Sequence, residues 1–346
     1  MYLLQKMRFN ITKTFIIVIM AAGAFLTASA SDNETDYKPQ IHGVFRGRYE
    51  MELRDGYARF QVRNARMSAQ GSISHSVNYF VQIDFSDNGK FLFLDAYGNI
   101  ALGRGWSIQA GQFRMPFGVE PFRGPNNYLF SNRSFLGKVG FNYRQVGAKL
   151  VFDTHIGTLP FTIEGGIFNS ASTVNHNVWQ KKYNFAGKAI LKVNNTSIGV
   201  GLASKEPDSV RVNAADISIG YKIGRWAFEA EGIVKKYTHD SYKTNWSYVA
   251  TANYVMPIKL GDFNALSFQG RFDGITDHSS GVRNASGKLI TDNPAVNRIS
   301  AGSTLSCIKG PFHADVRLNF EKYLYRDNSI PSGTDDRMLL ELIIQF

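Results

Sequence analysis

Residues 41–56 read IHGVFRGRYEMELRDG, and their side chains alternate between two classes. Apolar or small residues occupy the odd positions from Ile41 to Leu53, and mostly polar or charged residues occupy the even positions from His42 to Arg54. Because strand side chains alternate between two faces, this pattern predicts a two-faced strand that ends at an Asp-Gly turn. The stretch alone leaves the direction open, since an apolar face points inward in a soluble sandwich and outward, to lipid, in a membrane barrel.

The N-terminus has the composition of an export signal. A basic start precedes an apolar run over residues 15–26, and a small-residue A-x-A site ends at Ala30. These are the parts of a cleaved secretory signal, and the apolar run is short for a membrane-spanning helix. We therefore expect residues 1–30 to be a cleaved signal peptide and residues 31–346 to form one exported domain. The signal holds three basic and no acidic residues, so its removal lowers the net charge from +11 to +8.

The charges and the single cysteine exclude several classes of protein. Basic residues are interleaved with acidic ones and form no long run of like charge, and there is no nucleic-acid motif, so we expect no nucleic-acid partner. Cys307 is the only cysteine, which excludes a module held together by internal disulfides. We interpret Cys307 as an inert, small apolar residue.

Two-faced segments recur along the exported chain, and helical periodicity is almost absent. Within residues 57–70 the alternation slips by one position between Val62 and Ala65, which predicts a β-bulge. With the opening segment, the pattern predicts sixteen strands. The other fifteen are expected at residues 57–70, 77–86, 91–102, 106–114, 138–152, 160–169, 183–193, 197–204, 213–223, 226–237, 246–256, 265–273, 295–306, 312–323 and 335–346.

The links between these strands differ systematically in length. Long links, such as residues 115–137, 170–182 and 274–294, follow odd-numbered strands, whereas most links after even-numbered strands are tight. A membrane barrel with short periplasmic turns and long outer loops has this rhythm, and a sandwich gives no reason for it.

The last predicted strand, DRMLLELIIQF, places Met338, Leu340, Leu342, Ile344 and Phe346 on one face. It resembles the C-terminal strands of outer-membrane barrel proteins, which commonly end in Phe. Together with the export signal and the loop pattern, it predicts an all-β fold, a transmembrane antiparallel β-barrel of about sixteen strands. Apolar faces then meet outer-membrane lipids and polar faces line a lumen wide enough for water.

Residues 57–145 resemble the phosphate-selective porin O and P family of bacterial outer membranes. The stretches that carry the resemblance are VRNARMSAQGSISHSVNYFVQIDFS, FLDAYGNIAL, GQFRMPFGVEPF, LFSNRSFL and YRQVGAKL, of which GQFRMPFG is the most specific. The resemblance implies a homotrimer of sixteen-stranded porins in the outer membrane, and it implies selectivity for small anions such as phosphate. It also implies that the third outer loop, residues 115–137, folds inward and narrows the pore.

A conducting pore needs fixed charges that decide which ions enter, and it needs no catalytic residue or cofactor. One guanidinium group can donate two parallel hydrogen bonds to two phosphate oxygens, and the lysine ammonium is a point charge on a flexible side chain. We therefore expect basic side chains of the loop and the strand faces to form an anion pathway. The candidates are Arg46, Arg48, Arg59, Arg63, Arg66, Arg114, Arg123, Arg133, Arg144, Lys149, Lys188 and Lys192, with Arg271 and Arg317 also on strand faces.

For each of these side chains, an ion pair within the wall is the alternative, because acidic residues also point inward on the same strands. The best cluster is expected where Arg59, Arg63, Arg66 and Arg114 come together on strands near the third loop. Anion preference follows from this pattern, whereas phosphate specificity rests on the resemblance.

An outer-membrane barrel that works as a hydrolase or an adhesin is the competing hypothesis. The seven histidines are scattered, and the Ser-His neighbours at 74–76 and 278–280 have no carboxylate partner at a suitable spacing. No spacing of His, Cys and Asp predicts a metal site, and no glycine-rich phosphate loop precedes a helix. We therefore expect a channel rather than an enzyme, with no cofactor and no metal.

Overall fold

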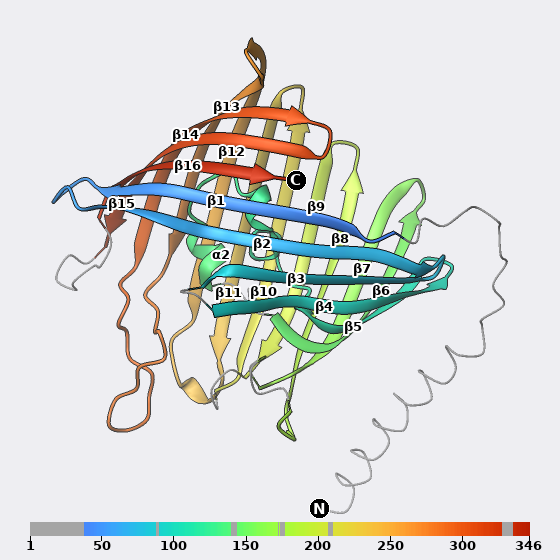
Figure 1. The fold of residues 1–346 in the computed structure, drawn as a ribbon. Coiled ribbons are helices and arrows are strands. Elements are labelled where there is room, and N and C mark those ends of the chain that lie inside the picture. The colour runs from blue at the N-terminus through green and yellow to red at the C-terminus, as the bar shows by residue number, and fades with distance from the viewer. Residues whose placement is uncertain are drawn as a thin grey trace, which may run out of the picture.

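The computed structural model describes residues 38–87, 90–139, 144–171, 173, 177–206, 210–326 and 335–346. Sixteen antiparallel strands follow one another around a closed barrel, and β1 pairs with β16 to complete it (Figure 1). Their bounds are β1 Gln40–Glu52, β2 Ala58–Ser74, β3 Val77–Asp87, β4 Lys90–Gly103, β5 Trp106–Arg114, β6 Arg144–Ile156, β7 Leu159–Asn169, β8 Tyr183–Val193, β9 Thr196–Lys205, β10 Val212–Ile223, β11 Trp226–Tyr237, β12 Asn245–Leu260, β13 Phe263–Ile275, β14 Val296–Lys309, β15 Phe312–Tyr325 and β16 Arg337–Gln345. The predicted fold and strand count are confirmed, while residues 1–30 of the expected signal lie outside the described residues.

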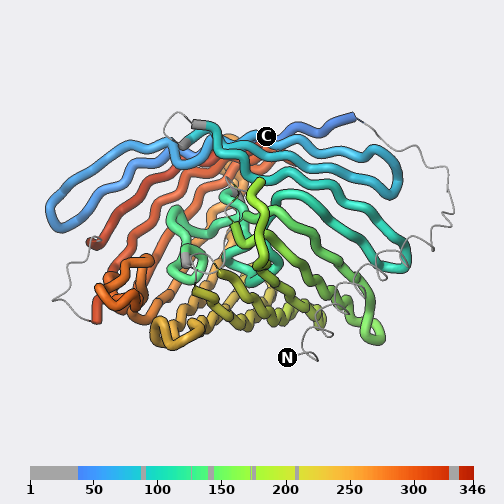
Figure 2. The backbone as a smooth tube through the Cα atoms, turned by 90° about the horizontal axis from the view of Figure 1, so that it is seen from below, coloured from blue at the N-terminus to red at the C-terminus, as the bar shows by residue number. Residues whose placement is uncertain are grey.

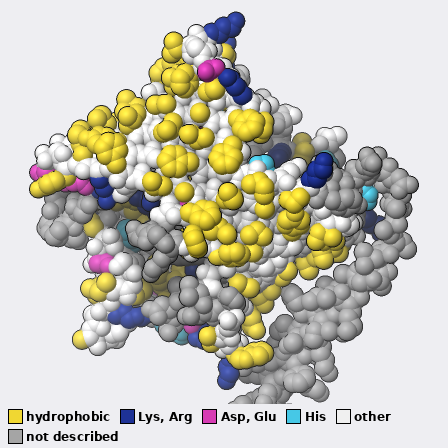
Figure 3. Space-filling view, viewed as in Figure 1, with side chains coloured by type: hydrophobic (Ala, Val, Ile, Leu, Met, Phe, Trp, Pro, Cys, Tyr) yellow, Lys and Arg dark blue, Asp and Glu magenta, His cyan; other side chains and the backbone are white. Residues whose placement is uncertain are grey.

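The predicted direction of the opening strand is also confirmed. On β1, Ile41 is 53% exposed at the outer surface, whereas Arg46, Arg48 and Glu50 are buried on the inner side. Hydrophobic side chains predominate over the outer face of the first strands (Figure 3). In a closed sheet every strand pairs with two neighbours, so no unpaired backbone N–H or C=O group meets lipid. The apolar face can therefore point to lipid while the polar face lines the lumen.

The predicted bulge lies in β2. Arg46 pairs with Asn64 and the next residue of β1, Gly47, pairs with Val62, so Arg63 is the extra residue. The bulge changes which face each later side chain of β2 occupies, so that Arg66 points into the lumen beside Asp84 of β3.

The barrel ends differ as the link lengths predict. Every link after an even-numbered strand is two residues long, such as 104–105 and 224–225, and the longest loop that is described in full at the other end spans 276–295. Aromatic side chains gather at both ends: Trp106 stacks on Phe152 near the tight turns, with ring centroids 4.3 Å apart, and Tyr49 contacts Phe60 near the long loops. Such belts mark the two membrane–water boundaries.

One predicted boundary is wrong. Residues 138–152 were expected to form a strand, but residues 135–139 form a short helix, α2 (Phe135–Val139), and β6 begins at Arg144. Leu136 of α2 is fully buried in a cluster with Met115 and Phe117 of the same loop. Contact with the loop, rather than with lipid, therefore decides the local conformation.

None of the helices within the described ranges is long and apolar enough to cross a membrane.

The C-terminal residue closes the barrel against a glycine. Phe346 and Gly43 exchange two backbone hydrogen bonds of 2.7 and 3.1 Å, and a Cβ on Gly43 would lie 2.2 Å from the Phe346 ring. We expect Gly43→Leu to destabilise the barrel by about 1–3 kcal/mol through overpacking. Urea unfolding of the protein in vesicles measures this, and Gly270→Leu is the matched control because open space faces that glycine. Equal midpoints for both variants would contradict the role of this contact.

Candidate functional site

The loop after β5 folds into the interior of the barrel. Residues 115–139 contain two short 3-10 helices, η2 (Glu120–Phe122) and η3 (Pro125–Asn127), followed by α2. Figure 2 shows this segment inside the ring of strands. Its hydrogen bonds reach β10 and β11 on one side and β1, β13, β14 and β15 on the other. The loop therefore crosses the lumen and is fixed at both sides.

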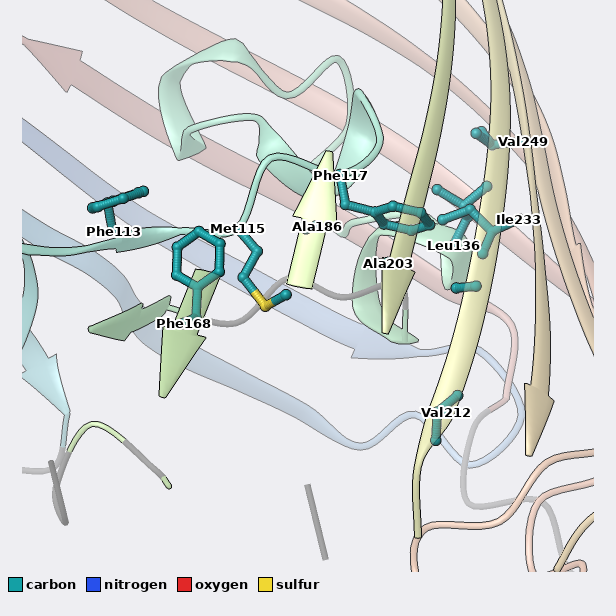
Figure 4. Packing of buried hydrophobic residues seen from close by; sticks show 11 residues of the cluster. Phe113, Met115, Phe117, Leu136, Phe168, Ala186, Ala203, Val212, Ile233 and Val249 are labelled. Atoms are coloured by element: carbon teal, nitrogen blue, oxygen red, sulfur yellow. The ribbon is translucent and has the colours of Figure 1, made fainter. Parts of the chain in front are cut away.

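An apolar seam on the inner wall holds the first part of the loop. Met115 and Phe117 are almost completely buried, and they pack with Leu136 against inward-facing side chains of the strands (Figure 4). The strand residues of this cluster are Phe113, Phe168, Ala186, Ala203, Val212, Ala214, Ile233 and Val249. The predicted polar lining of the lumen is thus interrupted here by an apolar surface against which the loop packs.

Two wall carboxylates form the first polar anchor. The backbone N–H of Val119 donates to Glu231 Oε1 at 2.9 Å, and that of Glu120 donates to Glu231 Oε2 at 2.7 Å. The N–H of Gly118 donates to Asp216 at 3.2 Å. Gly118 has φ +72°, and a Cβ there would lie 2.8 Å from Glu231 Oε1, so the turn requires glycine. Three successive N–H groups thus face the carboxylates of β10 and β11.

Arginines of β1, β13 and β14 form the second anchor by donating to loop carbonyls. The Ser131 carbonyl accepts from Arg46 at 2.9 Å. The next two carbonyls, at positions 132 and 133, accept from Arg271 at 2.7 Å and from Arg298 at 2.6 Å. Three consecutive carbonyls are therefore held by three guanidinium groups of β1, β13 and β14.

Loop N–H groups complete this second anchor. Ser131 donates to the Asn319 side chain at 2.7 Å, and Phe135 donates to Asp273 at 2.7 Å. Both carbonyl and N–H groups of the loop backbone thus have hydrogen-bond partners on the wall, as buried peptide groups require.

A buried ion-pair network supports the second anchor. Arg298 bonds Asp273 at 2.9 Å and Glu321 at 3.2 Å, and Arg271 bonds Glu321 at 3.0 Å. All four side chains are at most 3% exposed. Beside them, Glu341 bonds Arg46 at 2.5 Å and Arg317 at 3.1 Å. Buried charges of this kind are tolerated because each is paired and hydrogen-bonded.

Arg46 and Arg48, predicted as pathway residues, belong to this network. Arg46 is 2% exposed and Arg48 is 6% exposed. Arg48 donates to Asn132 of the loop at 2.7 Å and to Glu50 at 3.0 Å. Both therefore contact the loop and wall carboxylates in this structure, and neither is open to the lumen.

The three arginines of β2 have different environments. Arg59 bonds Glu50 at 3.0 Å yet its side chain is 58% exposed. Arg66 is largely buried and bonds Asp84 at 2.8 Å. Arg63, at the bulge, is exposed, and among the described residues its side chain has no carboxylate partner.

The expected cluster of Arg59, Arg63, Arg66 and Arg114 is only partly formed. Arg66 and Arg114 each lie near Arg144 and Tyr128. Arg59 is held instead by Glu50.

Arg114 and Arg133 are held by the loop rather than by acids. Arg114 donates to the Phe122 carbonyl at 2.6 Å and to the Arg123 carbonyl at 2.7 Å. Arg133 donates to the Arg123 carbonyl at 3.2 Å, and its guanidinium lies 4.8 Å from the centre of the Tyr128 ring. Within the part of the chain that the structure describes, neither forms an ion pair, so each leaves an uncompensated positive charge beside the loop.

Arg123 links the loop to the wall through carboxylates. It forms an ion pair with Glu229 of β11 and lies 3.5 Å from Glu120. Although burial lowers the pKa of its guanidinium, the charges of Glu229 and Glu120 outweigh burial and raise the pKa of Arg123.

The remaining predicted residues lie on the inner face of β6 and β8. Arg144 bonds Asp95 at 2.7 Å. Lys149 and Lys188 both form ion pairs with Glu164, with nitrogen–oxygen distances of 2.6 and 3.3 Å. Lys192 is exposed near a tight turn, and it has no side-chain partner among the described residues.

Two further charged residues were missed by the sequence reasoning. Arg298 stands in an alternating segment, so its inward position was readable, but its burial depends on the loop. Lys138 was expected in a strand and lies instead on α2, where its side chain is exposed. Although part of Lys138 is open to the lumen, the protein around its ammonium group limits hydration of the charge, and this desolvation, followed by the charge of Arg298, lowers the pKa of Lys138 to about 8.

Within the described ranges, no group of His, Cys, Asp and Glu side chains could hold a metal ion.

Comparisons with known proteins agree with this architecture. The chain is similar in fold to the Salmonella typhi OmpF structure, solved in complex with daunomycin, with a TM-score of 0.64 and 15% identity over 90% of this chain and 98% of that one. It is also similar to an anion-selective porin from Comamonas acidovorans, with a TM-score of 0.61 and 12% identity over 89% and 98% of the two chains. The outer membrane channel DcaP of Acinetobacter baumannii matches with a TM-score of 0.61 and 12% identity over 93% and 100%. A search of the curated proteins returns no match.

The sequence itself matches a family model, phosphate-selective porin O and P, over residues 37–188. This region contains β1 to β7 and most of β8, together with the whole described part of the third loop. Residues 37–188 are therefore similar to the phosphate-selective porin O and P family, and the closed sixteen-stranded barrel has the fold of outer-membrane porins.

Proposed function

We propose that the protein is a passive diffusion channel that favours small anions, and that the anions follow the wall from β2 to β8. The supporting observation is the imbalance of inward-facing charges on this arc. The described basic side chains are Arg59, Arg63, Arg66, Arg144, Lys149, Lys188 and Lys192, and the acidic ones are Asp84, Asp95, Asp153 and Glu164. The opposite arc is occupied by the second anchor of the loop, which leaves little room for solute there.

In this proposal the basic side chains have two roles. Arg46, Arg48, Arg271 and Arg317 position the loop or compensate wall carboxylates, because their guanidinium groups are buried. Arg63, Arg114, Arg123, Arg133 and the basic residues of the arc set the potential of the constriction. Charges that are already paired weaken the net potential, so anion preference is expected to be moderate.

Phosphate is the proposed physiological class of solute. It rests on the family match, and also on Arg133, which is only partly buried and whose guanidinium group lacks a carboxylate partner among the described residues. Guanidinium binds phosphate oxygens through paired, charge-assisted hydrogen bonds.

Planar-bilayer recording tests the proposal directly. In a KCl gradient, we expect an ohmic conductance with a reversal potential on the anion side, and added phosphate should reduce the chloride current. Cation preference would contradict the anion pathway. Anion preference without any effect of phosphate would contradict only the phosphate assignment. Absence of conductance would favour the hydrolase or adhesin alternative.

Lys138 provides a pH-dependent prediction. Its pKa of about 8 lies below the ordinary lysine value, so the side chain is charged below pH 8 and loses its charge as the pH rises through 8. We expect anion preference to fall between about pH 7 and pH 9, and the fall should be absent in Lys138→Arg, which stays charged. Reversal potentials at several pH values measure this, and an unchanged pH profile in Lys138→Arg would assign the titration to another group.

We also propose that three copies assemble, with apolar strand faces in contact. One similar solved structure is described as a trimer form of Vibrio cholerae OmpT. Light scattering of the detergent-solubilised protein should give three times the monomer mass. The cleaved signal at residues 1–30 stays a prediction, which N-terminal sequencing of the membrane-inserted protein tests.

A further inference from the structure

The tight-turn end of the barrel is strongly basic. Within two residues of the seven two-residue turns, the chain has six Lys or Arg and one Asp. The basic residues are Arg104, Lys192, Lys222, Arg225, Lys259 and Lys309, and the acidic residue is Asp262. Asp262 is already paired with Lys309 at 2.8 Å. The other five basic side chains are exposed, and within the described ranges they have no hydrogen-bond or ion-pair partner.

At the long-loop end, basic and acidic residues are mixed. Apart from the third loop, the described residues of the outer loops hold eight Lys or Arg and seven Asp or Glu. The tight-turn end thus has almost no acidic residues to offset its basic ones, whereas the two kinds are mixed at the other end, and the end with short turns faces the periplasm in barrels of this kind.

Two of the turns place an arginine beside a tryptophan of the aromatic belt. Arg104 precedes Trp106 in the sequence GRGW, and Arg225 directly precedes Trp226 in GRW. Trp106 stacks on Phe152, and Trp226 packs on Tyr254 with ring centroids 4.8 Å apart. Both tryptophans remain about half exposed at the outer surface, at 40% and 45%. Indole rings at this depth lie at the level of lipid headgroups.

The turn conformations fix these arginines at the rim. Arg104 has φ +51° between Gly103 at +86° and Gly105 at +82°, and Gly224 before Arg225 has φ +54°. These left-handed residues form the tight hairpins that match strand twist. Each guanidinium is therefore presented by a short, rigid turn rather than by a long loop.

From this arrangement we infer that the basic rim binds the headgroups of anionic glycerophospholipids in the periplasmic leaflet of the outer membrane. The positive charges complement the phosphate and glycerol headgroup of such lipids. Lys192 and Lys222 lie on the lumen faces of their strands, and the other basic residues lie on four of the seven turns, distributed around the barrel, which suits a surrounding lipid leaflet better than one docked protein. The neighbouring tryptophans place them at headgroup depth, where long basic side chains extend to the polar boundary.

The test uses the two tryptophans as reporters. In the full chain carrying Trp179→Phe and Trp246→Phe, only Trp106 and Trp226 remain. This protein is reconstituted in phosphatidylcholine vesicles that contain equal fractions of brominated phosphatidylglycerol or brominated phosphatidylcholine, and fluorescence quenching gives relative affinities. We expect about two- to fivefold preference for phosphatidylglycerol, which should disappear in 1 M salt. The bilayer contains the lipid in both leaflets, so the direction of insertion does not affect the result.

Two variants decide the assignment. Arg104→Gln combined with Arg225→Gln should remove most of the preference, whereas Lys181→Gln combined with Arg283→Gln in the outer loops should retain it. Equal quenching by both brominated lipids would overturn the inference, as would a preference that persists in the Arg104 and Arg225 variant. Competition by soluble inorganic phosphate at constant ionic strength would assign the rim to free anions and would also overturn it.

Discussion

Arg298→Met is expected to destabilise the barrel by about 3–5 kcal/mol, because it leaves buried carboxylates without their partner. Arg298 is completely buried and is bonded to Asp273, Glu321 and the carbonyl of Arg133. Methionine fills a similar length but offers no donor. The variant therefore loses ion pairs in the wall and one of the carbonyl contacts that hold the third loop.

Urea unfolding in vesicles measures this loss of stability. The matched control is Arg54→Met, whose pair with Asp335 is open to water, with 75% of the arginine side chain exposed; exposed pairs contribute about 0–1 kcal/mol. Adding Asp273→Asn to Arg298→Met should restore part of the stability, because the charge of Glu321 is then balanced by Arg271. A loss no larger than that of Arg54→Met would show that the network does not support the fold.

Neutralising Arg63, Arg133 and Lys138 together to Gln is expected to produce the largest change in ion selectivity. These three cations have no carboxylate ion-pair partner among the described residues and are at least partly open to solvent. In water, a unit charge about 8 Å from a passing ion contributes about 0.5 kcal/mol. Each charge attracts an anion and repels a cation equally, and with screening over about 10 Å at 0.1 M salt three such charges correspond to roughly a tenfold change in the ratio of anion to cation permeability.

Reversal potentials in a KCl gradient measure this ratio. The shift should be largest near 0.1 M salt and small at 1 M, where charges are screened within about 3 Å. Arg46→Gln is the informative comparison, because a buried, paired arginine should alter stability more than selectivity. An unchanged reversal potential in the triple variant would place the selectivity elsewhere, with Arg59, Arg66 and Arg144 as the next set to neutralise.

The sequence contains enough information for the barrel and much less for the constriction. Alternation along β1 and the slip at Arg63 fix strand faces, because in a strand the direction of each side chain follows from its position alone. The loop has no such periodicity. Its placement depends on Gly118 meeting Glu231 and on Ser131 meeting Arg46, contacts between residues that are more than eighty positions apart.

For the same reason, the sequence predicts which basic residues face the lumen better than it predicts whether each one is exposed to solute or buried in an ion pair. Arg48 and Arg63 are neighbours on the inner face of adjacent strands, yet one is covered by Asn132 and the other is exposed. Lys138 was assigned to a strand because the apolar pattern around it resembled alternation. In each case, the missing information is the position of the loop, which only tertiary contacts supply.

Both anchors of the third loop are made mostly by its main chain, through N–H groups at 118–120 and carbonyls at 131–133. Main-chain groups are present whatever the side chain, apart from the special needs of glycine and proline. Substitutions at loop positions that face the solute can therefore accumulate without moving the loop. The barrel can thus acquire new solute preferences during evolution, or in an engineered variant, while the architecture of its constriction stays the same.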